Sequence, residues 1–485
     1  MMVKFSKSNI IFFIVLLGLL LRIYDLGRES LWVDEVASYG FSKLAVSQFF
    51  KADYTDYTLP PLYYIILHMW TNIFGNSEFL MRLPSAFFGI VSIYLIYKVA
   101  GQIFDDEVGL LSSLFLALSV FHINYSQEAR MYSLMTVLVL LSYYFFLKLV
   151  AEYNINNSVG YITATTLLIY THYYGFFTIL AQNIYVGILL LKSKDKSKID
   201  VRKWISLQFL LILLYLPWIT ALIEGVNKIQ GGFWIPEPNL LELVKTFYIF
   251  SGSSLLILLF SISSLFAIFK IQRLNLNVSK DSKQYLLLTW LLSPIIIPLI
   301  ISKFTQPFYH FKYTIAASLA FYILVAAGVK NLRSRNIKLI VISLIVLFSL
   351  MNVAGYYSEI NKERWRNAAN LIDSNAQAGD LLLFNAGNTR GSYDYYSKRD
   401  DLVKKRFPEK TRDVDDINIK NLASIIEDHE RVWVIYSHSG DHQGLITSTL
   451  NESYNLLSHK SFVSNRGYNS GKEYVGVEIY LFEKK

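Results

Sequence analysis

Long apolar stretches alternate with short polar segments along the first three quarters of the chain. The clearest apolar blocks lie at residues 10–21, 110–121, 204–222 and 286–301. A helix needs about 20 predominantly apolar residues to cross a hydrocarbon core ~30 Å thick, and each block supplies that length or a large part of it. The pattern therefore predicts a polytopic α-helical membrane protein.

Composition agrees with this class. The 485 residues are 53% hydrophobic and only 17% charged, whereas soluble domains carry about 25% charged residues. The first apolar block follows Lys4 and Lys7, and no small-residue cleavage site comes after it, so we expect an uncleaved first span. The chain contains no cysteine, which excludes disulfides and thiol chemistry.

The net charge of +9 would suit a nucleic-acid partner, but the basic residues gather between apolar blocks, in residues 192–203, 270–283 and 330–338 and at the N-terminus. Basic loops of membrane proteins face the cytoplasm. These segments are therefore predicted to share the cytoplasmic side, with an even number of spans between each and the next. No nucleic acid is expected as a partner.

This parity decides the role of residues 60–75. The segment is amphipathic and too short to cross, so we expect it to lie in the plane of the outer surface. Eleven spans are then predicted, at residues 9–25, 82–103, 108–125, 132–150, 159–174, 176–191, 204–222, 253–270, 285–303, 313–329 and 339–356. The outer segments between them are 26–81, 125–131, about 172–176, 223–252 and 304–312.

The tail after residue 356 has a different pattern. Residues 363–376 have helical periodicity, and "DLLLFNA", "RVWVIYS" and "VGVEIYLFEKK" have the pattern of buried or half-buried strands. Strands that alternate with helices predict a small α/β domain. We therefore expect a transmembrane catalytic domain at 1–356, whose first outer loop (26–81) carries in-plane helices, and an extracytoplasmic α/β domain at 357–485.

The first outer segment contains two adjacent acids, Asp34 and Glu35, in "ESLWVDEVASYG" (29–40). One interpretation is a helix start, where the helix dipole favours acidic residues. The other is a carboxylate held at the boundary of water and lipid as a general base.

Three further outer segments place polar groups at the same predicted level. They add Glu128 and Arg130, His172 and Tyr173, and His310 and Lys312. Each has an ordinary interpretation, such as an interfacial aromatic belt or a lysine that reaches toward headgroups. Together, an acid and several basic groups at lipid level suit sugar transfer from a polyprenyl phosphate. The acid would accept the proton of an attacking hydroxyl, and the cations would stabilise the leaving phosphate.

Five motifs carry a resemblance to a known family. "LLLRIYDLGRESLWVDE", "LPPLYYIILHMW…FGNSEFLMRLPSAFFG", "NYSQEARMYSL", "THYYG" and "ERWRNAANLI…GDLLLF" resemble, in this order, glycosyltransferase family 39 of the GT-C superfamily. Its members include protein O-mannosyltransferases and the aminoarabinose transferase that modifies lipid A. The resemblance, over about residues 10–390, implies an inverting membrane transferase with a polyprenyl-phosphate or dolichyl-phosphate sugar as donor and an extracytoplasmic active site.

The resemblance also implies roles for single residues. Asp34 matches the catalytic aspartate, with Glu35 its usual neighbour. Tyr132 stands where relatives often carry a second acid, so that Glu128 is either its replacement or only a partner of Arg130. The expected site comprises catalytic Asp34, Glu35 and Glu128, donor-phosphate-binding Arg130, His172, His310 and Lys312, and pocket-lining Tyr132, Tyr173 and Tyr313.

Other functions remain open at this point. A transporter or flippase of lipid-linked glycans would need charge along a path through the membrane, but here the charges gather at one surface. A non-catalytic assembly protein would use its tail to bind a partner. The sequence identifies neither the sugar nor the acceptor, which is a lipid, a glycan or a protein. No metal ligand set is evident, although a divalent ion is left open, and "HSGDH" (438–442) is interpreted as a loop.

Overall fold

The computed structural model describes residues 6–50, 59–192, 200–230, 234–273, 278–409, 411, 413–464 and 474–485. Parts of two basic segments, 193–199 and 274–277, lie outside the described residues. The chain forms two compact units. The helical unit comprises Met1–Leu26, Ser42–Gly75 and Leu80–Gly355, and the sheet unit comprises Gly27–Phe41, Asn76–Phe79 and Tyr356–Lys485.

Apolar helices build the helical unit. They are α1 (Lys7–Ile23), η1 (Val46–Phe50), α3 (Leu62–Phe74), α4 (Glu78–Ile103), α5 (Asp106–Leu118), α6 (Val120–Ser126), α7 (Tyr132–Ala151), α8 (Ile155–Ile169), α9 (Gly175–Lys192), α10 (Val201–Tyr215), η3 (Leu216–Trp218), α11 (Ile219–Gln230), α12 (Leu240–Ser251), α13 (Ser254–Arg273), α14 (Val278–Ile301), η4 (Phe311–Thr314), α15 (Ile315–Lys330) and α16 (Arg335–Ser358). In the described residues, seven helices are long and apolar enough to cross a membrane, or nine if each of two bent pairs counts as one. The predicted total of eleven spans stays a prediction.

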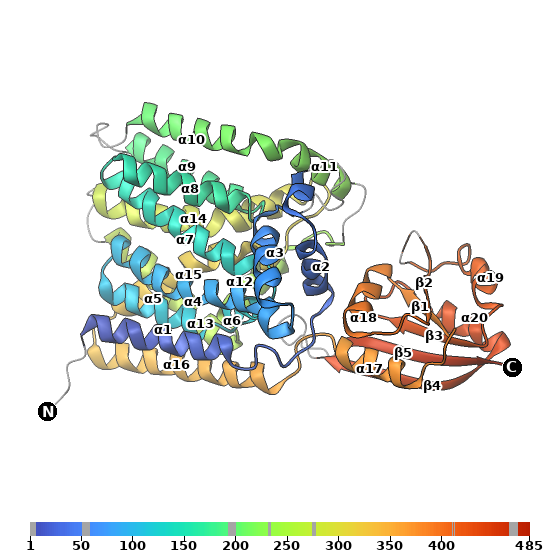
Figure 1. Cartoon of the computed structure of the whole chain (residues 1–485). Helices are drawn as coiled ribbons and strands as arrows, with labels where there is room; N and C mark the ends of the chain where they lie inside the picture. Colours follow the sequence, from blue (N-terminus) through green and yellow to red (C-terminus); the bar gives the residue numbers. More distant parts are fainter. Residues whose placement is uncertain are drawn as a thin grey trace. The chain divides into compact units, whose positions relative to one another are not determined.

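Helix α15 forms the centre of the helical unit (Figure 1). The apolar window at Phe311–Lys330 is 94% buried, and α15 packs against α13, α14 and α5. Gly328 permits the close approach to α13, because a Cβ there would lie 1.8 Å from the Ser263 carbonyl oxygen. A helix that is apolar on all sides and buried on all sides is expected at the core of a bundle.

Two pairs of helices meet at a sharp bend. α5 and α6 meet at Ser119 with a bend of 62°, within the predicted span 108–125, and α12 and α13 meet with a bend of 97°, at the predicted boundary between the outer segment 223–252 and the span 253–270. Arg22 of α1 compensates the first break, since its Nη2 and Nη1 donate to the carbonyls of Leu116 and Ala117, each at 3.2 Å. Arg22 is fully buried. It therefore adds donors to carbonyls at the end of the broken helix, where the Leu116 carbonyl otherwise accepts only the long bond from the Ser119 N–H at 3.4 Å.

Charged and aromatic contacts join the flanks of the predicted basic segments at one end of the helical unit. Three ion pairs link the start of α5 to lysines of α1, α15 and α16: Lys7–Asp106, Lys330–Asp105 and Lys338–Glu107. Lys283 lies 5.3 Å from the ring centroid of Phe104, and Lys192 lies 4.1 Å from that of Tyr285. These contacts support a common side for the basic segments, and the assignment of that side to the cytoplasm stays a prediction.

Figure 1 draws α3 across the ends of the bundle helices, as expected for an in-plane helix. The Leu62 N–H donates to the Tyr170 carbonyl at 3.0 Å. The Tyr63 hydroxyl lies 2.9 Å from Ser85 Oγ of α4. Both contacts hold α3 over the region where α8 ends and α4 begins.

A five-stranded sheet organises the sheet unit. Its strands are β1 (Leu381–Asn385), β2 (Val403–Arg406), β3 (Arg431–Tyr436), β4 (Tyr454–Ser464) and β5 (Tyr474–Lys484), in the order β2-β1-β3-β5-β4. β1 pairs in parallel with β2 and β3, and β5 is antiparallel to both β3 and β4. Helices α17 (Trp365–Asn375) and α18 (Arg390–Tyr396) contribute to one apolar core, and α19 (Leu422–Ile426) and α20 (Leu445–Ser453) to another. The predicted α/β tail is confirmed.

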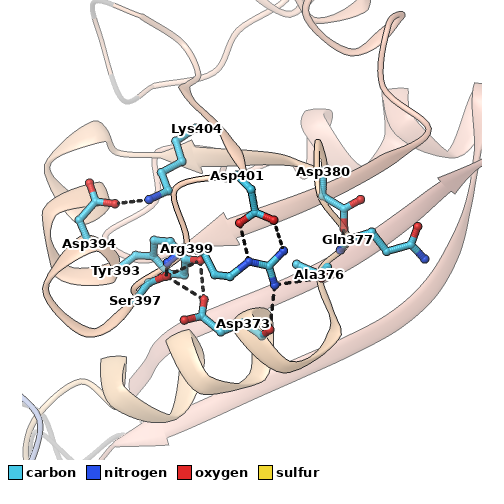
Figure 2. Close-up of polar contacts among 10 residues, drawn as sticks. All are labelled: Asp373, Ala376, Gln377, Asp380, Tyr393, Asp394, Ser397, Arg399, Asp401 and Lys404. Carbon is cyan, nitrogen blue, oxygen red and sulfur yellow. Dashed lines mark hydrogen bonds and ion pairs between the residues drawn. The ribbon is translucent and has the colours of Figure 1, made fainter.

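A polar cluster fixes the C-terminal end of α17 (Figure 2). Arg399 forms a bidentate pair with Asp401 at 2.6 and 2.7 Å and donates to the carbonyls of Asp373 and Ala376 at 3.0 and 3.1 Å. The Asp373 carboxylate in turn accepts from the Tyr393 hydroxyl at 2.6 Å. The last carbonyls of a helix have no partner within it, so this arginine acts as a C-terminal cap.

Helix α2 (Val33–Ser42), which carries Asp34 and Glu35, is part of the sheet unit. The Leu31 N–H donates to the Tyr396 hydroxyl at 2.7 Å, and the Tyr39 and Tyr395 rings are 5.0 Å apart. Contacts more than 300 residues apart in sequence therefore attach this segment to the tail.

Candidate functional site

An aromatic and cationic cluster forms in the helical unit where three loops meet. The segment before α7, the turn between α8 and α9, and the loop with η4 all contribute. The ring of Tyr313 lies 5.1 Å from that of His172, 5.7 Å from that of His310 and 6.4 Å from that of Tyr132. Three of the four outer segments that were predicted to converge are thus brought together.

Arg130 lies within the helical unit and is only 6% exposed. Its Nη1 donates to the Tyr64 hydroxyl of α3 at 3.3 Å, and its carbonyl accepts from Ser85 Oγ of α4 at 3.1 Å. The short segment Gln127–Met131 therefore connects α6 and α7 while contacting two further helices. A guanidinium held this way presents fixed donors.

Glu128 precedes Arg130 and is equally buried. Its Oε1 accepts from the Asn124 amide at 3.2 Å, and its carbonyl accepts the Arg130 N–H at 2.8 Å. The neighbouring Gln127 donates to the Tyr24 carbonyl at 2.7 Å, which ties this loop to the end of α1. The carboxylate is therefore placed on a well-anchored turn.

His172 lies in the turn between α8 and α9, outside both helices. Its Nδ1 accepts the N–H of Tyr174 at 3.1 Å, so in the neutral ring the proton is assigned to Nε2. Burial, together with the positive charges of Arg130 and Lys312, lowers the pKa of His172 to about 3. At neutral pH this residue therefore offers an N–H donor and no charge.

Lys312 supplies the second cation of the cluster. Its Nζ lies 5.0 Å from the ring centroid of Trp234 and 5.5 Å from that of Tyr313, which are cation–π distances. His310 precedes it, and the His310 Nδ1 accepts the Lys312 N–H at 3.3 Å.

Tyr173 lies beside the cluster, and its hydroxyl accepts from Trp218 Nε1 at 3.4 Å. Trp234 is not among the predicted site residues. The sequence shows only that it is an aromatic residue in a segment rich in glycine and proline, and such a segment alone does not indicate a site.

The acid pair of the sheet unit has two different environments. Glu35 is fully buried, accepts the Trp32 N–H at 3.4 Å and pairs with Lys362 Nζ at 3.4 Å. A glutamate that reaches back to the residue before a helix forms half of a capping box. Asp34 is half-buried, and its carbonyl accepts from Ser38 Oγ at 3.1 Å. Asp34 is therefore the better candidate for chemistry, and Glu35 for structure.

Three residues around this pair are not among the predicted site residues. Lys362 and Glu363 lie just before α17 and are buried, and Glu363 accepts from His438 Nε2 at 2.6 Å. In the sequence Lys362 and Glu363 belong to the charged run "NKERWR", which overlaps one of the resembling motifs, and such a run is also typical of a solvated helix start. His438 belongs to "HSGDH", and in that motif Asp441 accepts the Leu445 N–H at 2.8 Å at the start of α20.

Among the residues that the structure describes, no group of three or more His, Cys, Asp or Glu could hold a metal ion.

The comparisons with known proteins agree with the resemblance of the sequence. Residues 58–220, about a third of the chain, match the family described as "Dolichyl-phosphate-mannose-protein mannosyltransferase". No curated protein sequence matches significantly.

Two solved structures share the fold. ArnT from Cupriavidus metallidurans bound to undecaprenyl phosphate is 11% identical, with a TM-score of 0.61 over 98% of both chains. The oligosaccharyltransferase AglB from Archaeoglobus fulgidus, in complex with an inhibitory peptide and a dolichol-phosphate, is 11% identical, with a TM-score of 0.57 over 88% of this chain and 69% of that chain. At such identities the likeness shows the fold. The chain has the GT-C fold of a multi-pass membrane protein, which confirms the predicted helical fold with an α/β tail. The number of spans and the side on which the tail lies stay predictions.

Proposed function

We propose that the protein is an inverting glycosyltransferase that moves a sugar from a polyprenyl-phosphate donor to an acceptor hydroxyl at the outer face of the cytoplasmic membrane. Asp34 is the general base in this proposal. Arg130, His172 and Lys312 bind the donor phosphate, with His310 beside them, and Tyr132, Tyr173 and Tyr313 line the pocket.

The observation that carries the proposal is the meeting of two cations and a neutral imidazole in the helical unit. Arg130 can bind a phosphate through two parallel N–H groups, Lys312 adds a point charge, and His172 adds an N–H donor. Aromatic and apolar neighbours exclude water, which strengthens each interaction with an anion. ArnT and AglB, which share the fold, were solved with undecaprenyl phosphate and a dolichol-phosphate.

The proposed reaction is a single displacement. The Asp34 carboxylate accepts the proton of the acceptor hydroxyl while that oxygen forms a bond to the anomeric carbon. The bond between this carbon and the phosphate oxygen breaks on the opposite side, which inverts the configuration. The polyprenyl phosphate leaves with the electron pair, and the cationic cluster stabilises its new charge.

The first experiment replaces the proposed base. Asp34→Asn in the full-length protein is expected to lower transfer by ~10²–10⁴-fold, the range that a general base contributes. Binding of the polyprenyl-phosphate donor to proteoliposomes should persist, because the cluster is intact. Asp416→Asn, at an exposed aspartate of the sheet unit, is the control and should keep full activity.

The sugar and the acceptor are identified by mass spectrometry of envelope lipids, glycans and proteins from cells with and without the gene. We expect one sugar to disappear from one carrier in the cells without it, and its return with the wild-type chain but not with Asp34→Asn. Normal transfer by the Asp34→Asn protein would refute the assigned base.

A further inference from the structure

We propose that Lys362 and Glu363 are positioning residues that set the location of Asp34. The inference deepens the proposed function and rests on it, since it concerns the same carboxylate. All the contacts that carry it lie within the sheet unit. Neither residue is assigned a role by the resemblance of the sequence.

The first contact is the buried ion pair of Lys362 with Glu35. Glu35 is fully buried and Lys362 is 6% exposed, and the atoms Nζ and Oε2 are 3.4 Å apart. A buried charge is costly unless a partner compensates it. The pair therefore fixes the first turn of α2 to the segment before α17, because separating them would leave both charges buried.

The second contact comes from the next residue in the chain. Glu363 is fully buried, and its Oε2 accepts the N–H of Val33 at 3.4 Å. Val33 is the first residue of α2, and the first N–H groups of a helix have no partner within it. A carboxylate is also favoured there by the helix dipole. Two adjacent tail residues thus hold Val33 and Glu35, the two neighbours of Asp34 in the chain.

Glu363 is itself held rigidly. Its Oε2 accepts from Trp365 Nε1 at 2.8 Å, and its Oε1 accepts from His438 Nε2 at 2.6 Å. His438 follows β3 in a left-handed backbone conformation, with φ of 53°. Gly476 of β5 packs against Glu363, since a Cβ there would lie 3.3 Å from the Glu363 Cα. The anchor of α2 is therefore packed against β5 and the loop that follows β3.

The helix behind the anchor is also fixed at its far end. α17 begins two residues after Glu363, and the Arg399 cluster caps its last carbonyls (Figure 2). Movement of the anchor would thus disturb a capped helix and a packed sheet. A catalytic group that is misplaced by about 1 Å can lose ~10²-fold in rate, so this rigidity bears on the rate of transfer.

The test uses the full-length enzyme and the transfer assay above. Lys362→Met is expected to lower kcat by ~10²-fold while the KM for the donor changes less than threefold, because the cationic cluster is untouched. Lys362→Arg keeps the charge and should restore most of kcat. The matched control is Lys404→Met, which removes another ion-paired lysine of the sheet unit, 2.8 Å from Asp394 (Figure 2).

A second pair of measurements separates positioning from general stability. Amide hydrogen exchange of residues 33–38 should become faster in Lys362→Met and in the milder Glu363→Gln, while the amides of β1 and β3 stay protected. The exchange of charges in Glu35→Lys with Lys362→Glu should recover part of kcat relative to either single variant. A role in overall stability alone would lower the apparent kcat in proportion to the folded protein lost, would leave the kcat of the folded fraction at the wild-type value, and would also expose the amides of β1 and β3 to exchange.

The outcomes distinguish this inference from the function on which it rests. If Asp34→Asn is inactive while Lys362→Met and Glu363→Gln keep wild-type kcat, the positioning inference is wrong and the function stands. If Asp34→Asn keeps full transfer, the proposed function itself is wrong. Loss of kcat in Lys404→Met equal to that in Lys362→Met would also overturn the inference.

Discussion

Single residues of the cluster have environments that their type alone does not reveal. The sequence predicts a basic group at position 172, whereas burial between two cations leaves His172 neutral. Lys312 lies at cation–π distance from the rings of Trp234 and Tyr313. The positions of Arg130, His172 and Lys312 could be predicted from motif and topology, but their protonation and orientation depend on neighbours from distant segments.

The depressed pKa of His172 predicts a pH dependence of stability. The unfolded chain binds a proton at this residue near pH 6.5, and the folded protein binds it only near pH 3. Stability should therefore fall as pH drops through this window, by roughly 1.4 kcal/mol per pH unit at most. His172→Gln removes the contribution, so its melting temperature should fall less between pH 7 and pH 5.

Thermal unfolding in detergent at both pH values measures this difference. His442→Gln, at an exposed histidine, is the control. Equal losses in wild type and His172→Gln would contradict a neutral His172. His172→Gln should also keep part of the transfer activity, because glutamine retains an N–H donor.

At the scale of elements, hydropathy predicts the apolar helices well and their breaks poorly. The predicted span 108–125 becomes α5 and α6, because Ser119 Oγ accepts the His122 N–H at 3.3 Å and starts a new helix within an apolar run. A single serine changes the hydropathy average little, so the pattern carries no sign of the bend. The attachment of α2 to the tail was equally invisible, since periodicity reports which face is buried and not what buries it.

The break between α5 and α6 predicts a cost for removing its partner. Arg22→Met would leave the Leu116 and Ala117 carbonyls without these donors inside the helical unit. The Leu116 carbonyl would keep only the Ser119 N–H at 3.4 Å. An unpaired buried polar group costs about 1–3 kcal/mol, so we expect a clear loss of stability in denaturant unfolding. Arg335→Met, at an exposed arginine of α16, should lie within about 0.5 kcal/mol of wild type. Wild-type stability of Arg22→Met would show that the break does not depend on these bonds.

At the scale of the whole molecule, the proposed chemistry divides between the two units. The base belongs to the sheet unit, and the phosphate-binding cluster with Glu128 belongs to the helical unit. The structure describes each unit by itself, so the predicted meeting of Asp34 and Glu128 stays a prediction. It rests on the predicted placement of both acids on the outer face.

The absence of natural cysteines permits a direct test of this meeting. A chain with Asp34→Cys and Glu128→Cys is expected to form a crosslink with a short bifunctional thiol reagent in membranes. The crosslink would be read as a mobility shift or by mass spectrometry after proteolysis. Chains with Asp34→Cys alone or Glu128→Cys alone are the controls and should give no crosslink within the chain. Failure of the 34–128 pair, with both thiols accessible to a monofunctional label, would contradict a shared site.

The grouping of α2 with the sheet unit has a practical consequence for exchanging parts between proteins of this fold. Residues 27–41 and 76–79 cluster with the tail, so a chimaera joined only near residue 356 would separate Asp34 from its natural anchor. A chimaera that receives the tail of this protein should therefore also receive residues 27–41 and 76–79, so that α2 keeps its contacts with Lys362 and Glu363.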